Sequence, residues 1–383
     1  MPPGLDPRLT ELPLERLRRR RSAKWSRYGP DVLPAWVAEM DFPLAPAVKR
    51  ALLEAVELDD CGYANPEQLG DAFAGFAARR HRWEVHPAAV SPSSDVVGAI
   101  AAVLEVLTRP GDRVILNTPV YHPFFAMLAE AGCELVEAPL AGAELDPEAI
   151  ARAFAGGAAA LVLCSPHNPA GSVPSRGQLE AVAAAAAQHG AWVLVDEIHA
   201  PLTLPGAEHL PFLAVSEEAR QRGIAFWSAS KPFNLAGLQC AEIVTASPAA
   251  AEVVRRLPVG ATHCGHLGAV ASIAAFRAGD EWLDAVIAVL DHNRRLLARL
   301  LADRLPEVGY RPPQAGYLAW LDLRRLGLGP DPAAPILERG RLALSPGPQF
   351  GPQGAGFARL NLGTSPALVE EAVERICRSA GSG

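Results

Sequence analysis

Between about residues 45 and 278, short apolar runs alternate with longer segments whose apolar residues recur every three or four positions. Arg113–Leu116 and Leu161–Leu163 are two of the short runs. Runs of this length are typical of buried strands, and the longer segments are typical of helices with one buried face. Strands that alternate with helices usually pair in parallel, because each helix carries the chain back across the sheet. The alternation therefore predicts an α/β fold with a mostly parallel sheet and helices on both faces.

The last hundred residues have a different pattern. The segment from about Glu281 to Leu305 has apolar residues at three- and four-residue spacing, which predicts a long helix with one buried face. Short strand-like segments follow, at Leu318–Leu323, Leu342–Leu344 and Phe357–Leu362. We therefore expect an N-terminal arm with part of a small domain (residues 1–44), a large domain (45–280), and a bridging helix with the rest of a small α+β domain (281–383).

Composition favours a cytoplasmic enzyme that acts on small molecules. The net charge of −7 argues against a general nucleic-acid binder. Six cysteines without a repeating spacing suit reduced thiols in a cytosol. The alanine-rich run from Ala181 to Ala187 is too short to span a membrane, and no apolar stretch of a signal peptide follows the basic run from Arg16 to Arg21. We expect no metal at His263–His266, because a second cluster of ligands is missing.

Lys231 lies shortly after the apolar run Gly223–Trp227, which is typical of a buried strand. A lysine at the end of such a strand loses hydration, which favours its neutral amine and makes it able to form a Schiff base. Taken alone, the residue is more simply explained as a solvated surface charge. Other segments of the chain favour a catalytic role for Lys231.

Three further polar residues follow or interrupt apolar runs. Asn168 lies in a Pro- and Gly-punctuated turn after one run, Asp196 ends another, and Arg359 lies inside the apolar segment Phe357–Leu362. Each has a structural explanation of its own, as a turn former, a helix cap or the partner of a buried acid. Their order and spacing along one chain are harder to explain in that way.

The order Asn168, Asp196, Lys231, Arg359 resembles that of fold type I pyridoxal phosphate (PLP) enzymes, the aspartate aminotransferase superfamily. Within it, nearly the whole chain resembles the MalY/PatB group of cystathionine β-lyases. The segments that carry this resemblance are Lys24–Trp25, Tyr28–Asp31, Leu33–Phe42, Gly62–Tyr63, Thr118–Tyr121, Asp196–His199, Tyr317–Asp322 and Leu344–Gly351. The resemblance implies a large domain with a mostly parallel sheet of the seven-stranded type, and a smaller α+β C-terminal domain.

The resemblance also implies a role for each of these residues toward pyridoxal 5'-phosphate. Lys231 would bind the cofactor covalently and move the substrate Cα proton, and Asp196 would keep the ring nitrogen protonated. Asn168 and His199 would lie near the cofactor's phenolic oxygen. Tyr121 would stack on the ring, although packing in the core is an alternative for this residue.

The cofactor's phosphate is expected where a helix opens after Ser94, because free backbone amides at a helix N-terminus favour an anion. An ordinary helix cap is the alternative there, and both can hold together. The residues assigned to this end are Asp95, Val96, Val97, Ser228 and Ser230. By resemblance, Tyr63 would reach the phosphate of a neighbouring subunit, which implies a homodimer with shared active sites.

Two residues depart from the superfamily pattern. Gln239 stands where many aminotransferases have an arginine for the phosphate, and Pro232 directly follows the lysine. Gln239 removes a bidentate cation and leaves the charge balance at the phosphate open. The change is compatible with the MalY/PatB resemblance.

For the amino-acid substrate, the resemblance implies that Arg359 holds the α-carboxylate through a fork of two hydrogen bonds. Asn168, Tyr121 and the backbone at Ala38 would complete the substrate site. The sequence shows no obvious second arginine for a side-chain carboxylate, which weakens the case for an aminotransferase of dicarboxylic amino acids.

Two reactions can use this set of residues. The group resemblance favours β-elimination from L-cystathionine or a related cysteine S-conjugate, which gives a thiol, pyruvate and ammonia. The alternative is an aminotransferase that passes the amino group to a keto acid. A PLP-binding regulatory protein is a third hypothesis, which the complete catalytic set and the lack of a convincing helix-turn-helix disfavour.

Overall fold

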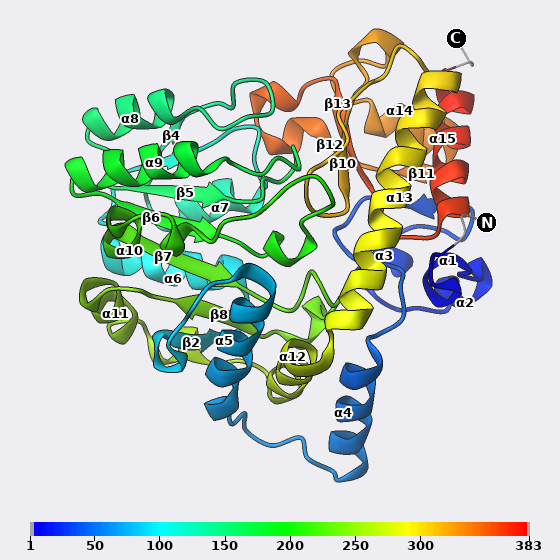
Figure 1. The fold of residues 1–383 in the computed structure, drawn as a ribbon. Coiled ribbons are helices and arrows are strands. Elements are labelled where there is room, and N and C mark those ends of the chain that lie inside the picture. Colours follow the sequence, from blue (N-terminus) through cyan, green and yellow to red (C-terminus); the bar gives the residue numbers. More distant parts are fainter. Residues whose placement is uncertain (1–3, 381–383) are drawn as a thin grey trace.

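A seven-stranded sheet forms the centre of the chain in the computed structural model, which describes residues 4–380 (Figure 1). Six strands run in one direction, and only β8 is antiparallel to both of its neighbours. In spatial order the strands are β2 (Val90–Ser93), β8 (Ala241–Val244), β7 (Gly223–Trp227), β6 (Trp192–Asp196), β5 (Ala160–Cys164), β3 (Arg113–Leu116) and β4 (Glu134–Glu137). The predicted α/β fold with a mostly parallel seven-stranded sheet is confirmed.

The central strands are apolar on both faces, which explains why they appear in the sequence as continuous apolar runs. In β5, Leu161 and Leu163 pack into one hydrophobic cluster, while Ala160, Val162 and Cys164 pack into another. Successive side chains of a strand point to opposite faces, so the two clusters lie on the two sides of the sheet. Parallel sheets need such cover on both faces.

Helices supply this cover on each side. One face packs against α6 (Val96–Leu107), α7 (Pro123–Glu130) and α11 (Pro248–Arg255). The cluster on the other face includes residues of α4 (Pro46–Glu57), α5 (Glu67–His81), α8 (Pro147–Ala155), α9 (Arg176–Gln188), α10 (Glu217–Arg222) and α12 (His266–Ala278). The sheet is therefore the middle layer of three, as Figure 1 shows.

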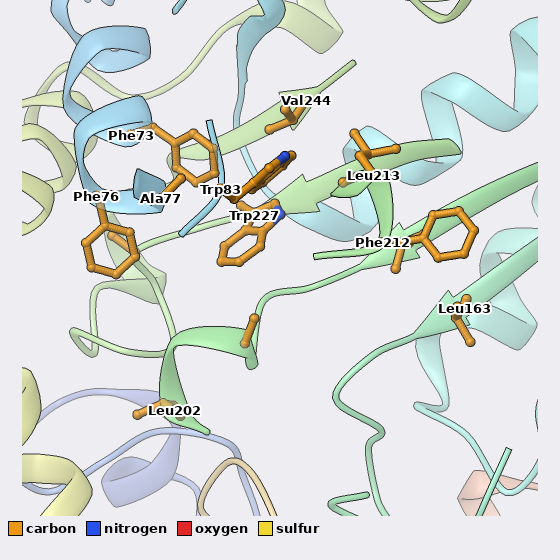
Figure 2. Close-up of a cluster of buried hydrophobic side chains, with 14 of the residues drawn as sticks. Phe73, Phe76, Ala77, Trp83, Leu163, Leu202, Phe212, Leu213, Trp227 and Val244 are labelled. Atoms are coloured by element: carbon orange, nitrogen blue, oxygen red, sulfur yellow. The ribbon is translucent and has the colours of Figure 1, made fainter. Parts of the chain in front are cut away.

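An aromatic cluster fixes the end of β7, the strand that precedes Lys231 (Figure 2). The Trp227 ring lies 5.5 Å from that of Phe73 and 5.8 Å from that of Trp83, measured between centroids. Its indole N–H donates to Glu197 Oε2 at 2.7 Å, so the buried ring has a polar partner. Packing at Trp227 thus holds the chain four residues before the lysine.

A second, antiparallel sheet lies beside the first. Its strands, in spatial order, are β12 (Ser345–Pro346), β13 (Phe357–Asn361), β10 (Leu318–Asp322) and β9 (Gly309–Tyr310), and β1 (Leu33–Pro34) pairs separately with β11 (Leu342–Ala343). Its core is a third cluster, to which α14 (Ala333–Gly340) and α15 (Pro366–Ala380) contribute. The pairing of β1 with β11 ties the N-terminal segment to this part of the molecule.

Helix α13 (Asp280–Arg304) connects the two regions. Its first half, including Trp282 and Leu290, packs into the cluster beside the large sheet, whereas Leu297 and Leu301 in its second half pack into the third cluster. The predicted helix from about Glu281 to Leu305 is confirmed. The division of the chain at residues 44 and 280 stays a prediction, which this distribution of the core supports.

The N-terminal arm contains more regular structure than its irregular sequence indicates. It forms the short helices α1 (Pro7–Thr10), α2 (Leu14–Arg18) and α3 (Ala23–Ser26). Lys24 is buried and pairs with Asp41 at 2.9 Å, and Arg20 of the basic run donates to the carbonyl of Asp41 at 2.7 Å. Part of the basic run therefore binds backbone instead of standing free in solvent.

One helical stretch, Val259–Ala278, is long and apolar enough to cross a bilayer by length and composition alone. Core helices of globular proteins pass the same test. Within this stretch, α12 packs against α4 and α5, with Ala271 and Phe276 buried in the cluster beside the large sheet. Packing against α4 and α5 therefore buries one face of α12.

Candidate active site

A cavity of about 140 Å³ lies where β5, β6 and β7 end. Carboxyl ends of neighbouring parallel strands meet at one edge of a sheet, where α/β proteins bind ligands. All but two of the residues predicted for the site line this cavity. They are Ala38, Asp95, Val96, Val97, Tyr121, Asn168, Asp196, His199, Ser228, Ser230 and Lys231. The two exceptions are Arg359, which lines an adjoining cavity, and Tyr63, which lines neither.

The amine of Lys231 donates a hydrogen bond to the carbonyl of Ala38 at 3.1 Å. The pKa of Lys231 is lowered to about 8, chiefly by burial and also by the Arg359 cation, against the opposing effect of Asp196 and Glu39. A buried ammonium loses hydration, so burial favours the neutral amine over the charged form. The expected loss of hydration at this lysine is thus present, and the free amine is accessible near neutral pH.

The chain contains three lysines, and only Lys231 lines the cavity. Lys24 is held in its buried ion pair with Asp41, and Lys49 is exposed on α4. Any chemistry in this cavity that requires a lysine amine must therefore use Lys231.

Asp196 ends β6, and its carboxylate accepts the backbone N–H of Ile198 at 3.1 Å. Burial raises the pKa of Asp196 to about 6, although the Ile198 hydrogen bond and the Lys231 charge both oppose the rise. A carboxylate in such a place lacks a strong cationic partner, and a protonated ring nitrogen in the cavity would supply one. The residue therefore fits the acid that the PLP ring requires.

His199 is buried, and its Nδ1 atom has no hydrogen-bond partner among the described residues. The pKa of His199 is lowered to about 3, chiefly by burial and also by the nearby charges of Lys231 and Arg359, so the imidazole is neutral. Its ring packs edge-on against Tyr317 at 6.0 Å between centroids. The Nδ1 atom lies beside Gly316, while the neutral imidazole as a whole lines the cavity, where it can exchange a hydrogen bond with a ligand.

Helix α6 begins at the cavity. Asp95 is its N-cap, and the carboxylate of Asp95 accepts the backbone N–H of Gly98 at 2.8 Å. Val96 and Val97 follow as the first helical residues, and both line the cavity. Their backbone N–H groups have no partner within the helix, as at every helix start, and the helix dipole favours an anion there. The helix cap and a phosphate site are thus compatible at this position.

Two serines that follow β7, Ser228 and Ser230, also line the cavity. Ser228 Oγ donates to the carbonyl of Cys240 at 2.6 Å and accepts the backbone N–H of Ser230 at 3.0 Å. Gln239 also lines the cavity, with a positive φ of 53°. The Ser228 hydroxyl proton is used by the Cys240 carbonyl in this structure, so Ser228 would have to turn away from that carbonyl to donate to a phosphate. An arginine of the usual kind is absent from the cavity's lining.

Arg359 lies in β13, in the second sheet, and its side chain is buried. It donates to Asn168 Oδ1 at 2.8 Å, to Ser345 Oγ at 3.1 Å and to the carbonyl of Trp36 at 3.3 Å. Burial lowers the pKa of Arg359 to about 10, which leaves it charged at neutral pH. Asn168 and Arg359 are therefore brought into direct contact by the two sheets.

Arg359 lines a second cavity of about 540 Å³, which shares Ala38, Tyr121 and Lys231 with the first. Tyr121 is half-buried between the two, and burial raises the pKa of its hydroxyl. The smaller cavity holds the groups predicted for the cofactor, and the larger one holds the predicted clamp for the substrate carboxylate. Lys231 faces both.

The sequence did not indicate two further residues of the site. Tyr317 is buried, and its hydroxyl donates to the carbonyl of Ala38 at 2.9 Å, so the Ala38 oxygen accepts from both Tyr317 and Lys231. Ser345 hydrogen-bonds Arg359 and also the carbonyl of Trp36. Both residues lie in segments that carry the resemblance, which was the available signal for them.

Known proteins resemble this chain over nearly its whole length. The family profile described as aminotransferase class I and II matches residues 37–376. A cystathionine β-lyase of Corynebacterium glutamicum is 36% identical, over 95% of this chain and 98% of the relative. The cystathionine β-lyase PatB of Bacillus subtilis is 34% identical, over 93% and 96%. Cystalysin of Treponema denticola, whose crystal structure contains a pyridoxal 5'-phosphate cofactor, superposes with a TM-score of 0.89 at 28% identity, over 94% and 96% of the two chains.

Proposed function

The chain belongs to the aminotransferase class I and II family, and from this premise we propose that it is a PLP-dependent carbon–sulfur β-lyase. Its substrate is L-cystathionine or a related cysteine S-conjugate, which it cleaves to a thiol, pyruvate and ammonia. The observation that carries the proposal is the position of Lys231, which faces both the cavity that contains Asp196 and the cavity that contains Arg359.

The residues of the first cavity fit the cofactor. Lys231 would hold it, Asp196 would face its ring nitrogen, and the start of α6 with Ser228 would hold its phosphate. When bound, PLP supplies an electron sink for the carbanion that forms at the substrate Cα. The uncompensated carboxylate of Asp196 is the feature of this chain that such a ligand would satisfy.

The chain's own groups then account for the remaining steps. Arg359 holds the substrate α-carboxylate and fixes the Cα–H bond relative to Lys231. The amine of Lys231 removes the Cα proton, which its lowered pKa permits near neutral pH. The electron pair left at Cα forms the Cα–Cβ double bond as the C–S bond breaks, and its electrons leave with the thiolate, which takes up a proton. Water then hydrolyses the remaining aminoacrylate to pyruvate and ammonia. The second cavity has the room that a substituted sulfur requires.

An aminotransferase is the second candidate, because the same lysine, aspartate and arginine serve both reactions. The family description supports it in general terms. The names of the Corynebacterium and Bacillus relatives favour the lyase. A regulator that only binds PLP is less well supported, because a complete set of reactive groups lines the two cavities.

Incubation of the purified PLP-loaded protein with L-cystathionine, without any keto acid, tests the reaction. We expect pyruvate, ammonia and homocysteine in equal amounts over many turnovers. Turnover that appears only when a keto acid is supplied, with no free thiol, would replace the lyase by the aminotransferase.

We also propose that the enzyme is a cytoplasmic homodimer. Tyr63 is fully exposed in the loop after α4, and Leu53, Val56 and Leu58 nearby are exposed large apolar residues. Such a run on a soluble surface favours burial by a partner. All six cysteines are free, which suits a reducing compartment.

In this dimer, Tyr63 donates a hydrogen bond to the phosphate in the partner's site. We expect Tyr63→Phe to raise the dissociation constant of PLP about tenfold, since one hydrogen bond to a charged group is lost. Fluorescence titration of the apoprotein with PLP measures this constant. Tyr310→Phe is the matched control, because Tyr310 lines neither cavity. An unchanged constant in Tyr63→Phe would refute the shared site.

A further inference from the structure

The second cavity contains charged groups for which the proposed reaction has no role. Besides Lys231 and Arg359, its lining includes Arg27, which follows α3, and Asp331, which precedes α14. Leu337 and other apolar residues complete the wall. A cysteine S-conjugate with an apolar tail would make use of the apolar wall alone. The two additional charges indicate a more polar occupant.

Arg27 is held in place by aromatic stacking. Its guanidinium carbon lies 5.2 Å from the centre of the Trp36 ring and 5.8 Å from that of Tyr28. No ion pair or side-chain hydrogen bond of Arg27 occurs within residues 4–380. The carbonyl of the same Trp36 accepts from Arg359 at 3.3 Å. One residue therefore positions both cations, and the hydrogen-bonding capacity of Arg27 remains free.

Asp331 is held by its own loop. Its Oδ1 atom accepts the backbone N–H of Ala333 at 3.2 Å, at the start of α14. The carbonyl of the preceding Pro330 accepts the N–H of Gly356 at 2.7 Å, which ties the loop to the chain three residues before Arg359. In the described part of the chain, Asp331 forms no ion pair, with Arg27 or with any other cation. Its second carboxylate oxygen is thus free to bind a ligand.

A substrate with an α-amino-acid group at each end matches this set of charges. Its reacting amine is used at the cofactor, and one carboxylate is held by Arg359. A carboxylate and an ammonium remain at the far end. We propose that Arg27 binds this distal carboxylate and Asp331 binds the distal ammonium, so that the enzyme selects thioethers whose leaving thiol is itself an amino acid.

The proposal rests on the proposed function and specifies its substrate class. Arg27 is exposed and Asp331 is half-buried at this cavity, so discrimination follows from pairing: a tail without charges forms no favourable contact with either group. A zwitterionic tail gives Arg27 a carboxylate partner and Asp331 an ammonium partner. Tails of equal length but different charge should therefore separate the two kinds of substrate.

Two non-cleavable ligands isolate the distal contacts. L,L-2,7-diaminosuberate has the length and both ends of cystathionine, with a methylene in place of sulfur, and L-2-aminooctanoate has the same chain length without the distal groups. Isothermal titration calorimetry of the PLP-loaded enzyme gives a dissociation constant for each. The ratio of the two constants reports the distal subsite, because the α-amino and α-carboxylate ends are common to both.

Arg27→Gln and Asp331→Asn test the two partners. Asp331→Asn keeps an oxygen that can accept the N–H of Ala333, so the start of α14 is preserved. Arg19→Gln and Asp303→Asn are matched controls at exposed positions that do not line the cavity. We expect each test variant to weaken diaminosuberate binding about tenfold relative to aminooctanoate, as for the loss of one charged hydrogen bond. Arg27→Lys should retain part of the preference, since its charge remains.

The proposal would be overturned if the ratio of the two dissociation constants in both test variants equals that of the wild type and the controls. Equal weakening of both ligands would also overturn it, because it would show that the substitutions disturb the reacting end. Neither ligand can undergo C–S cleavage, so these results do not depend on the lyase reaction. Failure to form pyruvate from cystathionine would refute the reaction alone.

Discussion

Lys231→Ala should lower kcat/KM for L-cystathionine by about four orders of magnitude or more, because it removes both the covalent partner of the cofactor and the base for the Cα proton. No second lysine can substitute. Lys24 is buried in an ion pair with Asp41, and Lys49 is exposed on α4. The pyruvate formed at saturating PLP and the visible absorbance of the bound cofactor measure the two losses separately.

Lys49→Ala is the matched control for this prediction, since it deletes an exposed lysine that lines neither cavity. It should behave as the wild type in both measurements. A thermal unfolding curve like that of the wild type would show that Lys231→Ala remains folded. Lys231→Ala protein that is folded and still turns over within tenfold of the wild type would contradict the assignment of the lysine.

Asp196→Asn should lower kcat about 100- to 1,000-fold, the usual effect of losing one preorganised electrostatic contact in an active site. The amide cannot balance a protonated ring nitrogen, so the ring withdraws electrons less well. The raised pKa of Asp196, about 6, belongs to a carboxyl that burial penalises, and a cation beside it would favour the ionised form. The rate of pyruvate formation at saturating cystathionine and PLP measures the change.

Glu242→Gln is the control for Asp196→Asn. Glu242 is a buried carboxyl in the same sheet, on β8, and lines neither cavity. Burial raises the pKa of Glu242 well above its ordinary value, which favours the neutral carboxyl, and an amide has nearly the same size and shape. A kcat for Asp196→Asn no lower than that of Glu242→Gln would show that Asp196 does not serve the cofactor ring.

The large sheet was predictable because its central strands are buried on both faces. The run Gly223–Trp227 coincides with β7, and Asp196 is the last residue of β6, as its position after an apolar run indicates. Residues at the carboxyl ends of these strands are brought together by the topology of a parallel sheet alone. The resemblance assigned Asp196, Lys231 and the start of α6 to one cofactor, and the topology of the sheet explains why they line one cavity.

The contacts between the two sheets were harder to predict from the sequence. Ser345 and Tyr317 help to hold Arg359 and the Ala38 carbonyl, yet neither lies in a pattern that indicates a polar contact. Arg27 lies just after a four-residue helix, α3, in a segment without periodicity. Helices this short depend on tertiary packing for stability, so local sequence carries little information about where they place a side chain.

The most direct test of the active site is the location of the covalently held cofactor. Reduction of the PLP-loaded enzyme with borohydride fixes the cofactor to the amine that holds it, and mass spectrometry of a digest then identifies the modified peptide. We expect the cofactor on the peptide that contains Lys231, with the peptides of Lys24 and Lys49 unmodified. Cofactor found on either of those lysines, with Lys231 unmodified, would contradict the site.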